Sequence, residues 1–220
     1  MKPPTDWTIP LAAGAIAVLT AMVAITAATG VSQETFEIVR APDVYNAELR
    51  LYAGPLRALF GLDSAFAILY TTLLATFARR LMTGDNKLLL TIAIGAGLAT
   101  CALDMLEDHH ILAMLRGAEH GIDASAAQIA FQHTESQLKF NLSYLGLFLI
   151  GLHIPRATWV GTVLAWLFTV GTLVQGAWLF AAPDALLPAG NYGRWLGYGV
   201  GFALVTAFVR KVRVTGPATT

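Results

Sequence analysis

Five ionisable residues that could carry acid–base or metal-binding chemistry lie close together at the end of a long apolar run. They are Asp104, Glu107, Asp108, His109 and His110. Carboxylates and imidazoles transfer protons in general acid–base catalysis, and they also ligate divalent metals. Because ionisable side chains at membrane depth are costly, they usually mark a functional site or a paired structural lock. This segment is therefore the first candidate site in the chain.

The spacing of these residues places the three carboxylates on one side of a helix. At 100° per residue, Glu107 and Asp108 lie about 60° and about 40° to either side of Asp104. The two histidines diverge from this face in opposite directions. We predict Asp104 and Glu107 as catalytic acid–base residues. We also predict Asp104, Asp108 and His110 as ligands for a divalent metal such as zinc, although the paired-histidine motif of zinc proteases is absent.

Other polar residues fall at a comparable depth in the neighbouring apolar runs, counted at about 1.5 Å per residue. We expect a ligand pocket that is lined by Asp63, Tyr70, Asp108, His133, Lys139 and Asn141. A buried carboxylate is stable only when a proton, a donor, a cation or a metal compensates its charge. The group therefore predicts a shared proton, a bound metal or Lys139 as the counter-ion. Glu135, four residues before Lys139, is expected to form an ordinary surface pair with it.

The composition predicts the elements that must position these groups. Hydrophobic residues make up 56% of the 220 residues and charged residues 13%, with a mean hydropathy of +0.61, whereas soluble domains carry about 25% charged residues. A spanning helix needs roughly 20 apolar residues, and such runs lie near 8–29, 57–78, 88–112, 138–156, 158–182 and 191–210. We predict an all-α integral membrane bundle of six transmembrane helices, formed by a single domain over residues 1–220.

Basic residues predict the orientation of these helices. Eight of them lie at the termini or in the second and fourth connections, namely Lys2, Arg79, Arg80, Lys87, Arg156, Arg210, Lys211 and Arg213. Lys and Arg near the ends of spans favour the cytoplasmic side. We therefore expect an inner-membrane protein with both termini in the cytoplasm. The first run is long for the apolar region of a signal peptide, so we expect it to be retained as a span.

Two outer connections are long, at residues 30–56 and 114–137. The first carries apolar side chains at helical spacing, which predicts a short helix over the mouth of the bundle; they are Val44, Tyr45, Leu49 and Tyr52. In the second, Asp123 precedes a run that favours a helix, so we predict Asp123 as the N-cap of the fourth helix. Both connections are expected to cap an acidic pocket that faces outward.

Glycines recur every four residues in the last apolar run, at Gly193, Gly197 and Gly201. Such a ridge lets a helix approach its neighbour closely. We expect it to seat another helix of this chain, a second copy in a homo-oligomer, or another membrane protein. The remaining expected partners are the lipid bilayer and a small molecule or lipid. Soluble-enzyme and nucleic-acid-binding motifs are missing, so no nucleic acid is expected.

Two short motifs resemble those of a set of uncharacterised bacterial multi-pass membrane proteins. They are Asp-x6-Tyr from Asp63 to Tyr70 and Asp-x-x-Glu from Asp104 to Glu107, although this chain has Asp108 where those proteins have Asn. The resemblance implies a bacterial membrane protein and brings no known activity. Hydrolases resembling alkaline ceramidases also hold zinc with Asp and His on several helices. This chain lacks their two histidines spaced four apart on a late helix.

Three functions are compatible with this pattern. We favour a small-ligand-binding or accessory membrane protein, in which the acidic cluster is a structural lock or holds the ligand. The first alternative is a membrane-embedded, metal-dependent enzyme that acts on a lipid-like substrate. The second is a proton- or cation-coupled carrier, which we rank last because the inner halves of the helices offer few polar residues and no inverted repeat is evident.

Overall fold

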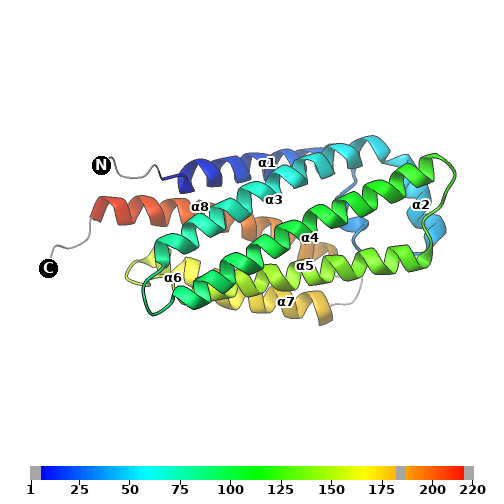
Figure 1. Ribbon diagram of the computed structural model, residues 1–220. Helices are drawn as coiled ribbons and strands as arrows, with labels where there is room; N and C mark the ends of the chain where they lie inside the picture. The colour runs from blue at the N-terminus through cyan, green and yellow to red at the C-terminus, as the bar shows by residue number, and fades with distance from the viewer. Residues whose placement is uncertain (1–5, 182–186, 216–220) are drawn as a thin grey trace. The chain divides into compact units, whose positions relative to one another are not determined.

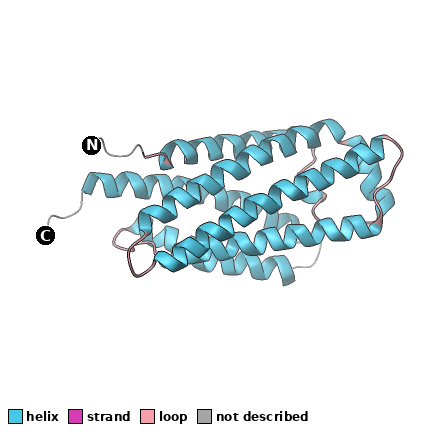
Figure 2. Cartoon of the chain, viewed as in Figure 1, coloured by secondary structure: helices cyan, strands magenta, loops and turns pink. Residues whose placement is uncertain are grey.

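A computed structural model describes residues 6–181 and 187–215, which fold into helices with no β-strand among them (Figure 2). The elements are α1 (Thr8–Thr29), the 3₁₀-helix η1 (Gln33–Thr35), α2 (Pro42–Leu51), α3 (Ala53–Leu81), α4 (Lys87–Glu119), α5 (Ala126–Leu152), α6 (Trp159–Trp166), the π-helix η2 (Leu167–Gly171), α7 (Thr172–Ala181) and α8 (Leu187–Thr215), as drawn in Figure 1. The prediction of an all-helical chain is confirmed.

Four helical segments are long and apolar enough to cross a membrane, within the described residues. They are α1, α3, α4 and Trp159–Trp178, the last of which runs through α6, η2 and most of α7. Each matches one of the predicted spans, and this is consistent with a membrane protein. The first has the predicted bounds, whereas α3 and α4 extend several residues beyond the predicted ends.

The fourth helix, α5, begins at Ala126 and ends at Leu152. Its start lies close to the helix start predicted after Asp123, ahead of the predicted span over 138–156, whereas its end comes before the predicted one. Pro155 explains the early end, because proline has no N–H to donate and restricts the residue before it to extended conformations. The helix therefore continues past the apolar run at its beginning and stops before the predicted end.

Glycines in left-handed conformation end two of the helices. Gly30, at φ +73°, follows α1, and its N–H donates to Thr26 O at 2.9 Å. Gly121, at φ +78°, follows α4, where Ile122 N–H donates to Gly117 O at 2.8 Å. This pattern is a Schellman motif, in which glycine at a positive φ lets the chain turn back and satisfy the last carbonyls of the helix.

Helix α5 begins with a capping box that centres on Ser125. The Ser125 hydroxyl accepts from Gln128 N–H at 3.3 Å, while Gln128 Oε1 accepts from Ser125 N–H at 2.9 Å. Our prediction of Asp123 as the N-cap was therefore wrong. Asp123 instead forms an exposed ion pair with Arg50, because serine two residues later offers the reciprocal Ser-x-x-Gln arrangement.

Replacing Ser125 with alanine is expected to lower the free energy of unfolding by about 1 kcal/mol, because an N-terminal N–H of α5 loses its acceptor. The matched change Asp123→Ala removes only an exposed ion pair and should cost less than about 0.5 kcal/mol. Denaturant unfolding in detergent micelles measures both values. A larger loss for Asp123→Ala than for Ser125→Ala would restore Asp123 as the cap.

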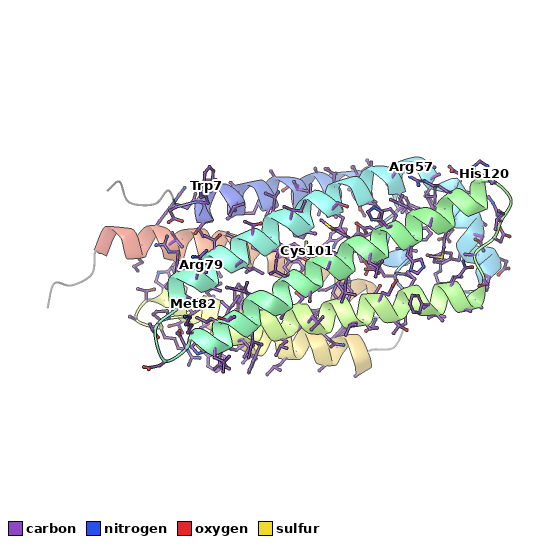
Figure 3. All side chains as sticks on the ribbon, viewed as in Figure 1. Trp7, Arg57, Arg79, Met82, Cys101 and His120 are labelled. Atoms are coloured by element: carbon purple, nitrogen blue, oxygen red, sulfur yellow. The ribbon has the colours of Figure 1, made fainter. Side chains whose placement is uncertain are left out.

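The helices divide into two compact units. Unit 2 consists of Ala17–Ile68 and Ala99–Asn141, and it contains η1, α2 and parts of the longer helices. Arg57 at the start of α3 forms an ion pair with Glu119 at the end of α4, and Figure 3 shows Arg57 close to His120. Cys101 lies on α4 and is half-buried (Figure 3). Unit 2 also contains the buried polar residues considered below.

Unit 1 consists of the chain up to Ile16, Leu69–Leu98 and the chain from Leu142 onward. Helix α8 packs against α6, η2 and α7. Phe77 and Phe208 meet edge to face, with ring centroids 5.9 Å apart. Gly146 of α5 lies close to α4, since a Cβ there would come within 3.2 Å of Ala93 O. Aromatic and small residues thus pack beside the many buried aliphatic side chains of this unit, such as Leu73, Leu164 and Val205.

Candidate functional site

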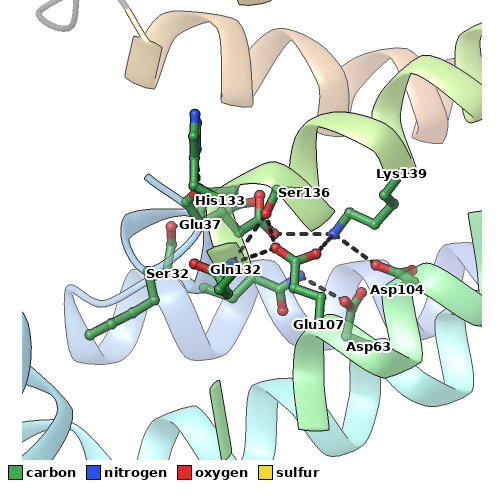
Figure 4. A network of polar contacts seen from close by, with 12 residues as sticks. Ser32, Glu37, Asp63, Asp104, Glu107, Gln132, His133, Ser136 and Lys139 are labelled. Carbon is green, nitrogen blue, oxygen red and sulfur yellow. Dashed lines mark hydrogen bonds and ion pairs between the residues drawn. The ribbon is translucent and has the colours of Figure 1, made fainter. Parts of the chain in front are cut away.

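Lys139 of α5 lies at the centre of a buried cluster of carboxyl groups in unit 2 (Figure 4). Its ammonium group is 2.8 Å from Asp104 Oδ1 and 3.4 Å from Glu37 Oε1, and it also contacts Glu107 Oε2. None of these four residues is more than 6% exposed. Three carboxylates therefore face one ammonium group, which leaves two negative charges in excess when all three are ionised.

Glu107 is held from α5 by two further side chains. Gln132 Nε2 donates to Glu107 Oε1 at 2.7 Å, and the Ser136 hydroxyl donates to the same oxygen. Gln132, Ser136 and Lys139 stand at positions i, i+4 and i+7, so a single face of α5 supplies all three contacts. Both Gln132 and Ser136 are fully buried. Donors of this kind fix the orientation of a buried carboxylate.

Asp63 of α3 and Asp108 of α4 add two more buried carboxyl groups to unit 2. Gln33 Nε2 donates to Asp63 Oδ2 at 2.8 Å. Asp108 lies near enough to Asp63 and Asp104 for their charges to act on it. We call these residues, together with those around Lys139, the Lys139 cluster: Gln33, Glu37, Asp63, Asp104, Glu107, Asp108, Gln132, Ser136 and Lys139.

The Lys139 cluster contains more buried acceptors than donors. Among the described side chains, Asp108 Oδ2, Gln33 Oε1 and Gln132 Oε1 are buried and have no hydrogen-bond partner. A buried polar atom without a partner costs about 1–3 kcal/mol. These three oxygen atoms can therefore accept hydrogen bonds from a bound group, and the Asp108 carboxylate can alternatively take up a proton.

The segment between α1 and α3 supplies Glu37 and packs tightly within unit 2. His133 Nδ1 lies 2.8 Å from the backbone oxygen of Glu37, which ties the segment to α5. Phe36 and Tyr45 are fully buried and meet edge to face at 5.4 Å. Burial raises the pKa of the Tyr45 phenol well above its usual range, and the nearby Glu107 carboxylate acts in the same direction. Tyr45 therefore stays neutral, and its hydroxyl donates to Phe36 O at 3.3 Å.

Helix α2 lies within residues 30–56 and confirms the short helix that was predicted for this connection. Of the predicted apolar stripe, Tyr45 and Leu49 are fully buried, whereas Val44 is exposed. Asn46, which we did not single out, joins α2 to the loop before α5. Its side chain donates to Ala124 O at 3.0 Å and accepts from Ala124 N–H at 2.8 Å. Figure 1 shows α2 beside this loop.

Arg40 and Glu48 form a two-point ion pair at the edge of the same segment, with N–O distances of 2.5 and 2.9 Å. The hydrogen bond from Arg40 lowers the pKa of Glu48 below its ordinary value of 4.5. The stabilisation is thus present above the pKa of unfolded Glu48, and it is lost as the pH falls through the lower folded value.

We expect Glu48→Gln to reduce the free energy of unfolding by about 0.5–1 kcal/mol near neutral pH, since the pair is partly exposed to solvent. This difference from the wild-type protein should shrink toward zero below about pH 4, where the unfolded state takes up a proton at Glu48. Denaturant unfolding across a pH series measures it. A difference that stays constant with pH would contradict this account of the pair.

The structure brings most of the predicted pocket residues together, with two exceptions. Asp63, Asp108 and Lys139 belong to the Lys139 cluster, and His133 contacts Glu37, as described above. Asn141 is exposed. Tyr70 belongs to unit 1, where its ring stacks on Tyr198 at 6.4 Å. The depth of a residue along its helix did not predict where these two side chains lie. Depth does not specify the direction in which a residue points around the helix axis.

The position of Glu135 contradicts the prediction that it forms a surface ion pair with Lys139. Glu135 is buried and lies 2.8 Å from His110 Nδ1, while the ammonium group of Lys139 turns to the carboxylates. The predicted divergence of the histidines is confirmed, since His109 is exposed and contacts the backbone of its own helix at Met105 O. Two neighbouring charge networks therefore share α5, and the i, i+4 pair does not form because each residue contacts a partner on α4 instead.

The predicted metal ligands engage different partners. Asp104 contacts Lys139, whereas His110 contacts Glu135. Within residues 6–181 and 187–215, no three His, Cys, Asp or Glu side chains are placed as a metal site requires. The set Asp104, Asp108 and His110 therefore remains a prediction from sequence without support from geometry.

Four of the cluster residues were missed as site residues in the sequence. Gln132 and Ser136 could have been found, because they precede Lys139 on the same helical face by two turns and one turn, respectively. Gln33 and Glu37 lie in and just after a 3₁₀ turn, where no periodic pattern marks which side chains point inward. Only the fold of the connection brings them to the buried acids.

Comparison with known proteins gives no family assignment. No protein family model, no curated protein and no solved structure matches the chain significantly. The function must therefore be inferred from the residues and their geometry.

Proposed function

We propose that the chain is an inner-membrane protein with six spanning helices, in which α5 and α8 cross the bilayer in addition to the four apolar segments. At 1.5 Å per residue, α5 with 27 residues and α8 with 29 residues exceed the roughly 30 Å of the hydrocarbon core. Helix α5 carries charged residues at membrane depth, where Lys139 pairs with Asp104 and Glu135 contacts His110. The distribution of Lys and Arg favours a bacterial inner membrane with both termini cytoplasmic.

Within this frame we propose a small-ligand-binding function for the Lys139 cluster. The ligand is a small, positively charged hydrogen-bond donor, of the ammonium or alkylammonium class. The observation that carries this proposal is the shortage of donors: Asp108 Oδ2 and two amide oxygens are buried without partners. A cationic donor would compensate the negative charge that the ionised carboxylates carry in excess of Lys139, and it would donate to these acceptors through hydrogen bonds that are stronger than those of a neutral donor.

The proposed catalytic role of Asp104 and Glu107 has less support. Both carboxylates contact Lys139, and Glu107 also accepts from Gln132 and Ser136. A general base must be able to approach the proton that it removes. These contacts would have to break before either carboxylate could do so, which favours binding over catalysis.

Binding of simple amines to the purified protein in detergent tests the proposal. We expect methylammonium to bind saturably in isothermal titration calorimetry, and sodium, which donates no hydrogen bond, to bind more weakly. Asp108→Asn should weaken methylammonium binding at least about tenfold, because loss of a charged hydrogen-bonding partner costs about 1.5–3 kcal/mol. The matched control Asp123→Asn changes an exposed aspartate and should leave binding unchanged.

The results that would contradict this function are equally concrete. Absence of saturable amine binding in the folded wild-type protein would reject it, and equal affinity for sodium would reject the need for a donor. The carrier alternative rests on the same excess of negative charge. It additionally requires uptake of methylammonium into proteoliposomes, which a binding or accessory protein would not produce.

A further inference from the structure

Unit 1 contains a cavity that the Lys139 cluster does not involve. Its volume is about 210 Å³, and its walls come from α5, η2, α7 and α8. A cavity of roughly 150 Å³ with apolar walls already accommodates a benzene molecule. The space in unit 1 is therefore large enough for a ring or for part of one hydrocarbon chain.

Apolar and aromatic residues make up most of the cavity wall. Leu147, Phe168 and Phe202 contribute hydrophobic surface, and Tyr144 contributes an aromatic ring. Binding sites for small molecules have this character, with mainly apolar walls and a few polar groups that orient the ligand. The wall predicts an occupant that is largely hydrocarbon.

The glycine ridge of α8 forms one side of the cavity. A Cβ at Gly201 would contact Phe168 at 3.4 Å, so this end of the ridge packs closely within the chain. A Cβ at Gly197 would have nothing within 4 Å. Gly197 therefore keeps space open, where the sequence pattern alone suggested close helix packing.

The π-helix η2 forms another part of the cavity wall. It covers Leu167–Gly171, and Leu167, Phe168 and Gly171 all line the cavity. The Thr172 hydroxyl lies 2.8 Å from Phe168 O and 2.9 Å from Thr169 O, so it satisfies carbonyls at the irregular turn. Short π-helical turns within α-helices occur frequently at functional sites.

Arg194 gives the cavity a charged group. It lies on α8, lines the cavity and is only 7% exposed. A guanidinium remains charged, carries five N–H donors, and matches the geometry of carboxylate and phosphate groups. With so many donors, Arg194 can keep a partner within the chain and still bind an anionic group in the cavity.

We propose that this cavity binds a single-chain amphiphile with an anionic head group, such as a fatty acid or an anionic lysophospholipid. The acyl chain occupies the apolar wall between η2 and the glycine ridge, and the carboxylate or phosphate pairs with Arg194. Gln175, which also lines the cavity, is placed to hydrogen-bond the head group. This site is separate from the proposed amine site, and either can fail without the other.

Photolabelling of the purified protein in phosphatidylcholine nanodiscs tests the proposal, with a diazirine-bearing palmitic acid as the probe. We expect labelled peptides from the 144–147 and 167–172 segments. Gly197→Phe should reduce labelling at least about fivefold by filling the cavity, whereas Gly197→Ala should leave most of it, because a single methyl group occupies little of the space. Arg194→Gln should also reduce labelling, whereas Arg210→Gln, at an exposed position, should not.

Competition distinguishes the source of the anionic head group. Excess palmitic acid should abolish labelling, and hexadecanol, which has the same chain without the charge, should compete at least about tenfold less. Competition by lysophosphatidylglycerol as well would extend the site to phosphate heads, and failure to compete would restrict it to carboxylates. Labelling that survives Gly197→Phe, or equal competition by hexadecanol, would overturn the proposal even if Arg194→Gln does not fold.

Discussion

Lys139→Met is expected to lower the free energy of unfolding by about 3–5 kcal/mol, the range found when one partner of a buried ion pair is removed. The change leaves Glu37, Asp104 and Glu107 without the ammonium group that all three contact. Lys139 is 4% exposed, so water cannot easily replace it. Denaturant unfolding of the purified protein in detergent micelles measures the loss.

Two further variants separate the loss of charge from the loss of packing. Lys87→Met makes the same substitution at an exposed position and should change stability by less than about 0.5 kcal/mol. Adding Asp104→Asn and Glu107→Gln to Lys139→Met should recover part of the lost stability, because the uncompensated charges are then removed. A loss below about 1 kcal/mol for Lys139→Met, or no recovery in the triple variant, would show that Lys139 is not the counter-ion of the cluster.

Asn46→Ala should lower the free energy of unfolding by about 2–4 kcal/mol, since it leaves both the N–H and the carbonyl of Ala124 without a partner. Each unsatisfied buried group costs about 1–3 kcal/mol. Asn46 is 1% exposed, and both of its bonds to Ala124 are buried. We also expect faster amide hydrogen exchange in residues 121–125, because Asn46 ties this loop to α2.

Asn86 provides a matched control for Asn46. It accepts from Thr83 N–H at 2.7 Å and donates to Leu81 O at 3.0 Å, in the exposed turn between α3 and α4. Water can replace these bonds, so Asn86→Ala should cost less than about 1 kcal/mol. Equal losses for Asn46→Ala and Asn86→Ala would mean that burial of the Asn46 bonds contributes little.

The two proposed sites depend on different properties of the chain. The Lys139 cluster depends on charge compensation among side chains from α3, α4, α5 and the segment after α1. The cavity of unit 1 depends on the absence of side chains at Gly197 and on the irregular turn at Leu167–Gly171. Variants at Asp108 and Gly197 therefore test separate hypotheses, and each has a control that leaves its site intact.

The sequence by itself determined that the chain is helical and that three carboxylates share one side of a helix. Long apolar runs can satisfy their backbone groups in a membrane only as helices or closed barrels. Their lengths predicted helices, and in the part of the chain that the structure describes four of these meet the length and composition of a span. The 3.6-residue period placed Asp104, Glu107 and Asp108 on one side of α4, and all three are buried. Both inferences depend only on local geometry within a helix.

Only the tertiary structure decided which groups meet those carboxylates. Rotation of each helix about its axis directs Lys139 to the acids, Glu135 to His110 and Asn141 to the surface. The helical period gives the directions of side chains relative to one another within one helix. It does not give the rotation of that helix relative to its neighbours. The fold of the connection after α1 brings in Gln33 and Glu37, whose contacts join residues that lie 30 and 102 positions apart.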